Sequence, residues 1–221
     1  MVDAKSNSER VEALRREYKR DGISEESVQQ NPLDQFTIWF EDALNTDMTD
    51  ANAMTLATST SDGKPSSRIV LLKGFDEEGF RFYTNYDSRK GKELSENPHA
   101  ALCFYWPALE RQVRIEGTVS KLSREQSASY FRSRPRDSQI GAWASQQSSR
   151  LKDREELEAN FEELKQKFKD QEVPLPDFWG GYTLLPEAVE FWQGRTGRLH
   201  DRILYIRPSK DQEWEIQRLN P

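Results

Sequence analysis

The chain has 221 residues and a mass of 25.8 kDa, which favours one domain with a sizeable core. Charged residues make up 32% of it and aromatic residues 11%, so the surface must be very polar while the chain still carries too many rings to be disordered. The net charge of −6 gives no global electrostatic footprint for nucleic acid, so any anion site must be local.

Cysteine and histidine are scarce. One cysteine, Cys103, excludes an internal disulfide framework, and two histidines leave no Cys/His cluster with metal-ligand spacing. The first 20 residues lack the apolar segment of a signal peptide, and no apolar run is long enough to span a membrane. We therefore expect a cytoplasmic protein that binds no metal, no nucleic acid and no membrane.

Two helices are predicted before the first strand. Residues 8–20 are charged and carry few apolar positions at helical spacing, which indicates a peripheral helix or a mobile arm. Asn31-Pro32 then starts a helix over about 33–45, whose residues Phe36, Trp39 and Ala43 form one apolar face. That face should dock on the body of the protein.

A period of two begins at residue 53, in short runs separated by turn residues. The predicted strands cover residues 53–60, 66–73, 80–84, 99–106, 111–122, 181–185, 188–193, 199–207 and 213–219. Most connections are too short for parallel crossovers, so the strands should form antiparallel hairpins that close, or partly close, into a barrel. We expect a mainly β fold with peripheral helices: one domain over residues 21–221, preceded by the arm of residues 1–20.

Three further helices are predicted among the strands. They lie near residues 88–96, from Ser123 to about 134, and over residues 153–170. Ser123 is followed three residues later by Gln126, the spacing of a capping box. Residues 135–141 are expected to be a loop.

The predicted helix near 88–96 begins with the basic run Ser88-Arg89-Lys90-Gly91-Lys92. Cations in a first turn oppose the helix dipole, and this run has no evident internal counter-charge. A bound phosphate would explain them, because free N–H groups and basic side chains would favour the same anion. The alternative is a solvated basic turn.

Two other stretches are rich in phosphate donors. Arg68 and Lys73 lie five residues apart in a predicted strand and would face opposite ways in a regular one. They could bind one ligand only if it reaches past the strand end or if the strand bulges. The alternative is that their charges protect an edge strand. Residues 130–141 lead from a helix end into a loop. The stretch contains three arginines, which could equally cap the helix C-terminus.

The segment 198–202 carries three cationic or titratable groups. If it is extended, Arg198, His200 and Arg202 share one face, which indicates an anionic ligand above them. Asp201 would then face the other way, although a carboxylate from a neighbouring strand could neutralise the row. A purely structural histidine is the alternative for His200.

Several motifs together resemble the pyridoxine/pyridoxamine 5′-phosphate oxidase family, over nearly the whole chain from Arg15 to Pro221. They are RIVLLK at 68–73, YTN at 83–85, SRKG at 88–91, RQV at 111–113, SRPRDSQIGAW at 133–143, QSS at 147–149 and VEFWQ-x4-RLHDR at 189–202. The resemblance implies an FMN-binding split β-barrel of antiparallel Greek-key type, and a homodimer with FMN in the subunit interface.

The resemblance also implies an activity in vitamin B6 metabolism. Such an enzyme oxidises pyridoxine 5′-phosphate and pyridoxamine 5′-phosphate to pyridoxal 5′-phosphate by hydride transfer from C4′ to FMN. O2 accepts the electrons and yields hydrogen peroxide, and the amine substrate also yields ammonia. The alternatives are another flavin reductase or oxidase on the same barrel, which would not need a second phosphate pocket, and a flavin-binding or pyridoxal-phosphate-delivering protein without turnover.

Carried over to this sequence, the resemblance implies three sets of site residues. The expected FMN contacts are Arg68, Ile69, Val70, Leu71, Leu72, Lys73, Tyr83, Thr84, Arg89, Lys90, Gln112, Gln147, Ser148, Trp192 and Arg202. The expected substrate contacts are Arg15, Arg16, Glu17, Tyr18, Lys73, Tyr130, Arg134, Ser138, Arg198, Leu199 and His200. The residues expected at the reaction itself are Arg198, His200 and Asp50.

Overall fold

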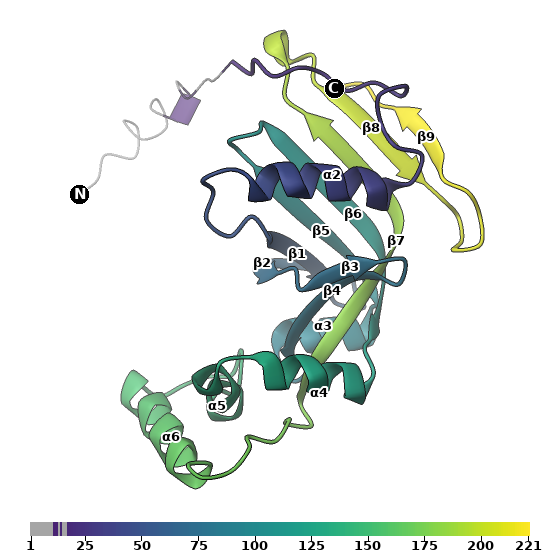
Figure 1. Cartoon of the computed structure of the whole chain (residues 1–221). Coiled ribbons are helices and arrows are strands. Elements are labelled where there is room, and N and C mark those ends of the chain that lie inside the picture. The colour runs from purple at the N-terminus through teal and green to yellow at the C-terminus, as the bar shows by residue number, and fades with distance from the viewer. Residues whose placement is uncertain (1–10, 13, 15–16) are drawn as a thin grey trace.

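The structure is a computed structural model that describes residues 11, 12, 14 and 17–221. Nine strands form one curled antiparallel sheet (Figure 1), in the order β2-β1-β5-β6-β7-β4-β3, with β8 pairing with β7 and β9 with β8. The strands are β1 (Ala53–Ser59), β2 (Pro65–Leu71), β3 (Gly74–Asp76), β4 (Gly79–Asn85), β5 (His99–Trp106), β6 (Arg111–Lys121), β7 (Trp179–Gln193), β8 (Asp201–Ile206) and β9 (Glu215–Arg218). The predicted mainly β architecture is confirmed.

β7 is one long strand, where two strands were predicted. Pro186 lacks an N–H donor, and a register shift against β6 at Glu116/Gly117 accommodates it without ending the strand. The first part of β7 pairs with β4 and the last part with β8. One strand therefore runs between the two ends of the molecule.

The helix α2 (Pro32–Leu44) lies across one face of the sheet and supplies the core beneath it (Figure 1). Asn31 caps it, as the sequence predicts, by accepting a hydrogen bond from the Leu33 N–H. Phe36 is fully buried among Phe75, Phe80 and Phe104. The predicted apolar helix face is confirmed.

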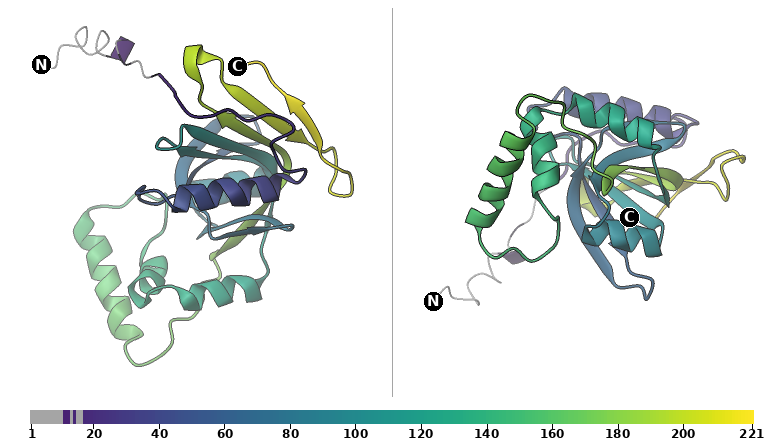
Figure 2. Two further views of the ribbon diagram at one scale, coloured as in Figure 1. Left: turned by 45° about the horizontal axis from the view of Figure 1, so that its top comes forward. Right: turned by 90° about the horizontal axis from the view of Figure 1, so that it is seen from below.

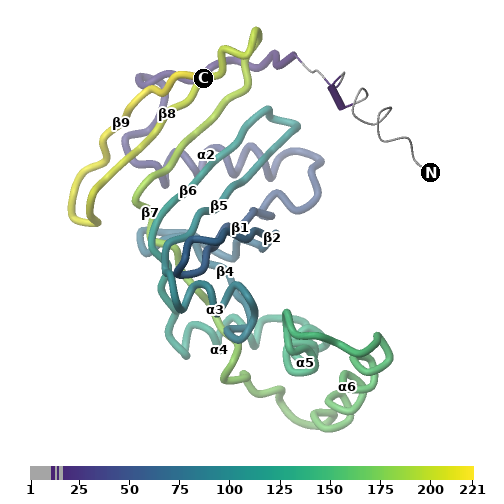
Figure 3. Tube along the Cα trace, turned by 180° about the vertical axis from the view of Figure 1, so that it is seen from behind, coloured from purple at the N-terminus to yellow at the C-terminus, as the bar shows by residue number. Residues whose placement is uncertain are grey.

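The other helices gather at the opposite end of the sheet from β8 and β9 (Figures 2 and 3). The predictions for α3 (Arg89–Glu96), α4 (Arg124–Ser133) and α6 (Arg154–Lys167) are confirmed, and the capping box of Ser123 and Gln126 forms. The predicted loop after α4 is wrong, because Arg136–Ala144 is the helix α5. Ile140 and Ala144, one turn apart, bury its inner face.

A second small core holds these helices together. It consists of Phe131, Ile140, Phe168, Val173 and Trp179, with Trp179 at the first residue of β7. The helical end is therefore packed separately from the main sheet core, and its inner wall faces the strand ends.

At the N-terminus, residues 17–20 are not helical, so the predicted helix over 8–20 does not extend through its described end. The backbone N–H groups of Lys19 and Arg20 donate instead to the buried carboxylate of Glu110. Among the described residues, no helix is both long and apolar enough to cross a membrane.

Candidate active site

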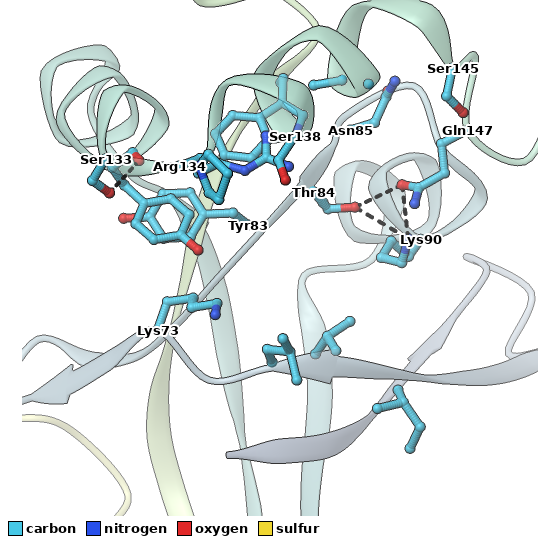
Figure 4. Close-up of a pocket in the computed structure, with 18 residues that line it drawn as sticks. Lys73, Tyr83, Thr84, Asn85, Lys90, Ser133, Arg134, Ser138, Ser145 and Gln147 are labelled. Carbon is cyan, nitrogen blue, oxygen red and sulfur yellow. Dashed lines mark hydrogen bonds between the residues drawn. The ribbon is translucent and has the colours of Figure 1, made fainter. Parts of the chain in front are cut away.

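A cavity of about 710 Å³ lies where α4 and α5 approach β2 and β4; we call it the α4–α5 cavity (Figure 4). Its side chains come from elements that are far apart in sequence but meet at the helical end. They are Ile69, Val70, Leu71, Lys73, Tyr83, Thr84, Asn85, Lys90, Tyr130, Ser133, Arg134, Pro135, Ser138, Gly141, Ala142, Ser145, Gln147 and Trp179.

Three cations line the α4–α5 cavity, and none of the residues that line it is acidic. Lys90 is buried, and its Nζ donates to Thr84 Oγ1 and Gln147 Oε1, each at 3.2 Å (Figure 4). Burial lowers the pKa of Lys90, and the nearby Arg68 lowers it further. Glu93 acts in the opposite direction, but the hydrogen bonds of the ammonium group to Thr84 and Gln147 go to neutral oxygens, so it is a candidate site for a bound anion.

Arg134 is the second cation of this cavity and follows the last residue of α4. Its guanidinium lies over the Trp179 ring, 4.7 Å from the centroid, and its Nη1 is buried with no hydrogen-bond partner. Burial also lowers the pKa of Arg134. An unsatisfied buried donor is costly, so this nitrogen is well placed for a ligand oxygen.

Lys73 is the third cation, and it lies two residues beyond the end of β2. Its side chain can therefore reach the cavity past the strand end, which was one of the two geometries that the sequence allowed. The rings of Tyr83 and Tyr130, which line the same cavity, stack with their centroids 3.8 Å apart. Ser138 on α5 adds a hydroxyl group to the cavity wall.

Arg68 and Arg89 have a different environment from Lys90. Arg89 Nε donates to Glu93 Oε1 at 2.8 Å, and Arg68 Nη2 lies 3.4 Å from Glu93 Oε2. The expectation of a basic first turn without an internal counter-charge is therefore wrong for Arg89. Glu93 lies one helical turn later, at a spacing that the sequence displays.

A neighbouring cavity of about 740 Å³, which we call the α3 cavity, lies between α3 and the 145–149 loop. Arg89 and Ser148 line it, and Gln147 lines both this cavity and the α4–α5 cavity. The predicted FMN residues of the helical end thus surround two adjoining spaces. Two of them are exceptions: the Leu72 side chain is buried in the sheet core, and Arg68, which donates to Thr58 and Ser66, lines neither cavity.

The β7–β8 turn carries the remaining predicted cations, but the premise that 198–202 is extended is wrong. Residues Thr196–Arg198 form a 3-10 turn, Arg198 has a left-handed φ of 63°, and β8 starts only at Asp201. Arg198 and Arg202 therefore do not form one row along a strand. Arg198 and Leu199 are both exposed.

His200 is half-buried between two aromatic rings of this region. Its ring centroid lies 4.7 Å from that of Trp192 and 5.5 Å from that of Tyr18. Its Nδ1 accepts a hydrogen bond from the Arg195 backbone N–H. Burial, and secondarily Arg198, lower the pKa of His200. The lowered pKa favours the neutral imidazole, whose proton then lies on Nε2, where it can donate a hydrogen bond.

A cavity of about 750 Å³ surrounds His200; we call it the turn cavity. It is lined by Leu14, Glu17, Tyr18, Trp192, Arg195, Gly197, Arg198 and His200. The N-terminal segment thus reaches the residues that the sequence expects at the substrate ring. Arg15 and Arg16, expected in the same segment, lie outside the described residues.

Arg202 lies in a row across three strands with Gln112 and Trp192. Their sequence neighbours Val113, Phe191 and Ile203 are buried in the core, so the row faces away from α2, on what we call the outer face of the sheet.

The positive charge of this row belongs to Arg202 and is neutralised by a carboxylate of the same chain. Arg202 donates to both carboxylate oxygens of Glu190, at 2.9 Å each, so a carboxylate from the neighbouring strand provides the counter-charge. Asp201 is also paired, with Arg195 and Arg218.

The structure separates the predicted site residues into two groups within one chain. The α4–α5 and turn cavities share no lining residue. The helices α4 and α5 and the turn between β7 and β8, which line them, lie toward opposite ends of the sheet (Figures 1 and 3). Asp50 lies in neither, in an exposed turn before β1 with a φ of 55°. Sequence reasoning did not assign Asn85, Ser145 or Trp179 to the site, although Asn85 belongs to the YTN motif at 83–85; Ser145 and Trp179 carry no charge or spacing signal.

Comparison with known proteins identifies the family of this chain. The family profile described as Pyridoxamine 5′-phosphate oxidase matches residues 40–168, and one described as Pyridoxine 5′-phosphate oxidase C-terminal dimerisation region matches residues 179–221. The chain belongs to the pyridoxine/pyridoxamine 5′-phosphate oxidase family. Family members from Rubrobacter xylanophilus and a Nostoc species are each 55% identical to this chain. Each match covers 94% of this chain, and it covers 95% of the Rubrobacter protein and 97% of the Nostoc protein.

Solved structures agree with this assignment. PhzG from Burkholderia lata, determined with tetrahydrophenazine-1-carboxylic acid, is 32% identical, with a TM-score of 0.85 over 91% of this chain and 98% of that one. A pyridoxamine 5′-phosphate oxidase-related, FMN-binding protein from Nostoc punctiforme has a TM-score of 0.69 at 21% identity over 88% of this chain and all of that one, and supports the fold.

Membership confirms the predictions of family, activity class and FMN dependence. The structural neighbours confirm the predicted split-barrel fold. The expected homodimer is supported as well, because residues 179–221 match the dimerisation region. All of the turn-region residues Trp192, Arg198, His200 and Arg202 fall inside that region.

Proposed function

We propose that this chain, as a homodimer with FMN, oxidises pyridoxine 5′-phosphate and pyridoxamine 5′-phosphate to pyridoxal 5′-phosphate, with O2 as electron acceptor. The observation that carries the proposal is the buried, unpartnered Nη1 of Arg134 in a cavity with three cations and no carboxylate among its lining residues. Such a cavity suits a ligand that carries a phosphate group, as both the substrate and FMN do.

We propose that each active site is built by two chains. The α4–α5 and α3 cavities of one chain would meet the turn cavity of the other across the outer faces of the sheets. Two observations support this: the two groups of site residues are separated within one chain, and the second group lies in the region that matches the dimerisation profile.

The residues present fit FMN. Lys90, with only neutral oxygens as partners, together with Arg68, Arg89 and Lys73, would hold its phosphate and ribityl chain, and Thr84 and Gln147 add neutral donors and acceptors. The partner's outer-face row of Gln112, Trp192 and Arg202 would contact the ring. When bound, FMN supplies the two-electron acceptor and passes the electrons to O2, releasing hydrogen peroxide.

The residues around Arg134 would bind and orient the substrate. Arg134, Tyr130, Ser138 and Lys73 would hold its phosphate, so that binding energy from a group that does not react fixes the position of C4′. Trp179 holds the Arg134 guanidinium through a cation–π contact and so keeps the donor in place.

His200 and Arg198 of the partner chain would act at the substrate ring. Neutral His200 donates a hydrogen bond from Nε2 and thereby orients the ring, since its Nδ1 is already occupied by the Arg195 N–H. Exposed Arg198 would stabilise the charge that changes as C4′ is oxidised. The roles of Asp50 near the substrate and of residues 1–20 as an arm over the site remain predictions, as does the cytoplasmic location.

Hydrogen peroxide release is the decisive assay. The purified protein, loaded with FMN, should release peroxide with pyridoxamine 5′-phosphate and O2, and should act very poorly on non-phosphorylated pyridoxine. A protein that binds FMN but releases no peroxide would be a carrier. Comparable efficiency on pyridoxine and its phosphate would remove the substrate-phosphate pocket from the proposal and favour another flavin oxidase.

A further inference from the structure

Glu93 on α3 is a buried carboxylate for which the proposed reaction has no direct use. Its exposed fraction is 3%, and it contacts residues from three elements. Oε2 accepts hydrogen bonds from Thr58 on β1 and Ser66 on β2, at 2.5 Å each, and Oε1 accepts one from Arg89 on α3 at 2.8 Å. Glu93 thus joins the helix to the first hairpin.

The two hydroxyl groups transmit the position of Glu93 to Arg68. Because Thr58 and Ser66 give their protons to Glu93, their oxygen lone pairs are free to face Arg68. Arg68 Nη1 donates to Thr58 Oγ1 at 2.5 Å, and Nη2 donates to Ser66 Oγ. The Arg68 guanidinium, whose side chain is 20% exposed, is therefore held in one orientation.

Charge and burial make this arrangement specific. Burial raises the pKa of Glu93, but the hydrogen bonds from Ser66, Thr58 and Arg89 outweigh it and bring the pKa to about 2. Glu93 is thus ionised throughout the working pH range. It lines the α3 cavity beside Arg89, and that cavity adjoins the one that contains Lys90.

We propose that Glu93 is a positioning residue for the FMN phosphate: it aligns Arg68 and Arg89 as a preorganised pair of donors. The proposal rests on the proposed function, in which both arginines contact that phosphate. A carboxylate this close to a phosphate repels it, so its presence favours binding only through the order that it imposes on the arginines. If repulsion of the phosphate dominates, removing the Glu93 charge should tighten FMN binding. If positioning of the arginines dominates, the same change should weaken FMN binding.

The experiment compares Glu93→Gln with Glu96→Gln by fluorescence titration of the FMN-free protein with FMN. Glu96 lies on the same helix and lines the same cavity, but it is exposed, so its variant removes an equal charge without disturbing the arginines. Positioning predicts that Glu93→Gln weakens FMN binding by about tenfold, the loss expected for a charged hydrogen-bond network. Glu96→Gln should leave affinity within about twofold of wild type.

A double-mutant cycle separates positioning from a general loss of stability. In an Arg89→Met background, Glu93→Gln should cost clearly less FMN affinity than in wild type, because part of its effect passes through Arg89. If Glu93→Gln does not fold, Glu93→Asp takes its place, since it keeps the charge but is too short to reach all of its partners.

Three results would overturn the proposal: unchanged or tighter FMN binding in folded Glu93→Gln, wild-type FMN binding in folded Glu93→Asp, or an equal loss with and without Arg89. Wild-type protein that fails to bind FMN would instead contradict the proposed function. The two failures are therefore distinguishable.

Discussion

The two ends of the molecule use basic side chains in different ways. At the β7–β8 end, Arg195, Arg202 and Arg218 each donate to a carboxylate of the same chain, at 2.8 to 3.1 Å. At the α4–α5 end, Lys90 donates to neutral oxygens, and one nitrogen of Arg134 has no partner. Cations of the first kind are neutralised within the fold, whereas those of the second kind are arranged for an anionic ligand.

A run of basic residues therefore does not by itself mark a ligand site. The segment 198–202 carries two arginines and a histidine, yet its Arg202 is neutralised by Glu190. The decisive quantity is the number of carboxylates within reach in the folded chain. Substitutions at the two ends should therefore have different consequences for ligand binding and for stability.

The largest effect is expected for Arg134→Met, which keeps a side chain over Trp179 but removes the charge. It should lower kcat/KM for pyridoxamine 5′-phosphate by roughly 100-fold, because charged hydrogen bonds to the phosphate are lost. FMN affinity should stay close to wild type. The control is Arg132→Met, an exposed arginine on the same helix; loss of FMN binding in Arg134→Met would place Arg134 in the cofactor site instead.

Lys90→Met should weaken FMN binding by roughly 30-fold, the value of a buried charged contact to phosphate. The same change should leave the FMN-free protein as stable as wild type or more stable, because it removes a buried ammonium without a carboxylate partner. Fluorescence titration and thermal unfolding without FMN measure the two effects. A parallel loss of both would make Lys90 a structural residue.

The lowered pKa of Lys90 also predicts a pH dependence. The phosphate favours the charged ammonium, so wild-type FMN affinity should fall as the pH rises through the lowered lysine pKa. Lys90→Met has no such group and should lose this alkaline dependence. Titrations from neutral to alkaline pH in both proteins test the sign, and identical profiles would contradict it.

Arg198→Met should reduce the rate of flavin reduction by about tenfold, which corresponds to ~1.4 kcal/mol. FMN content should not change, because Arg198 lies in the turn cavity away from the predicted phosphate contacts. Anaerobic stopped-flow absorbance measures the rate, and Arg198→Lys should recover part of it. If only substrate affinity falls, Arg198 is a binding residue and not a catalytic one.

The smallest effect is expected for Arg202→Met, which should lower the free energy of unfolding by about 1 kcal/mol. The reason is that Glu190 is left buried with only the more distant Arg114 beside it. Adding Glu190→Gln should restore most of the stability but not FMN affinity. Urea unfolding at fixed protein concentration tests the first statement and FMN titration the second. Recovery of both would leave Arg202 no role beyond its ion pair.

Local patterns predicted most elements correctly because their causes are local. The apolar spacing of α2, the cap at Asn31 and the capping box at Ser123 each depend on residues within one or two helical turns. The errors have causes at longer range: β7 continues through Pro186 because β6 shifts its register, and α5 forms because Ile140 packs in the helical core.

The antiparallel strands, most of the helices, the family and all three basic residues that line the α4–α5 cavity could be predicted from the sequence, because periodicity, caps and motifs encode them. Which cations are neutralised depends on the fold, since Arg202 meets Glu190 through strand pairing and Arg68 meets Glu93 through helix docking. The tertiary structure also showed that the two groups of site residues lie apart in one chain. The physical reason is that burial and pairing of charges depend on distances in space, which sequence spacing does not contain.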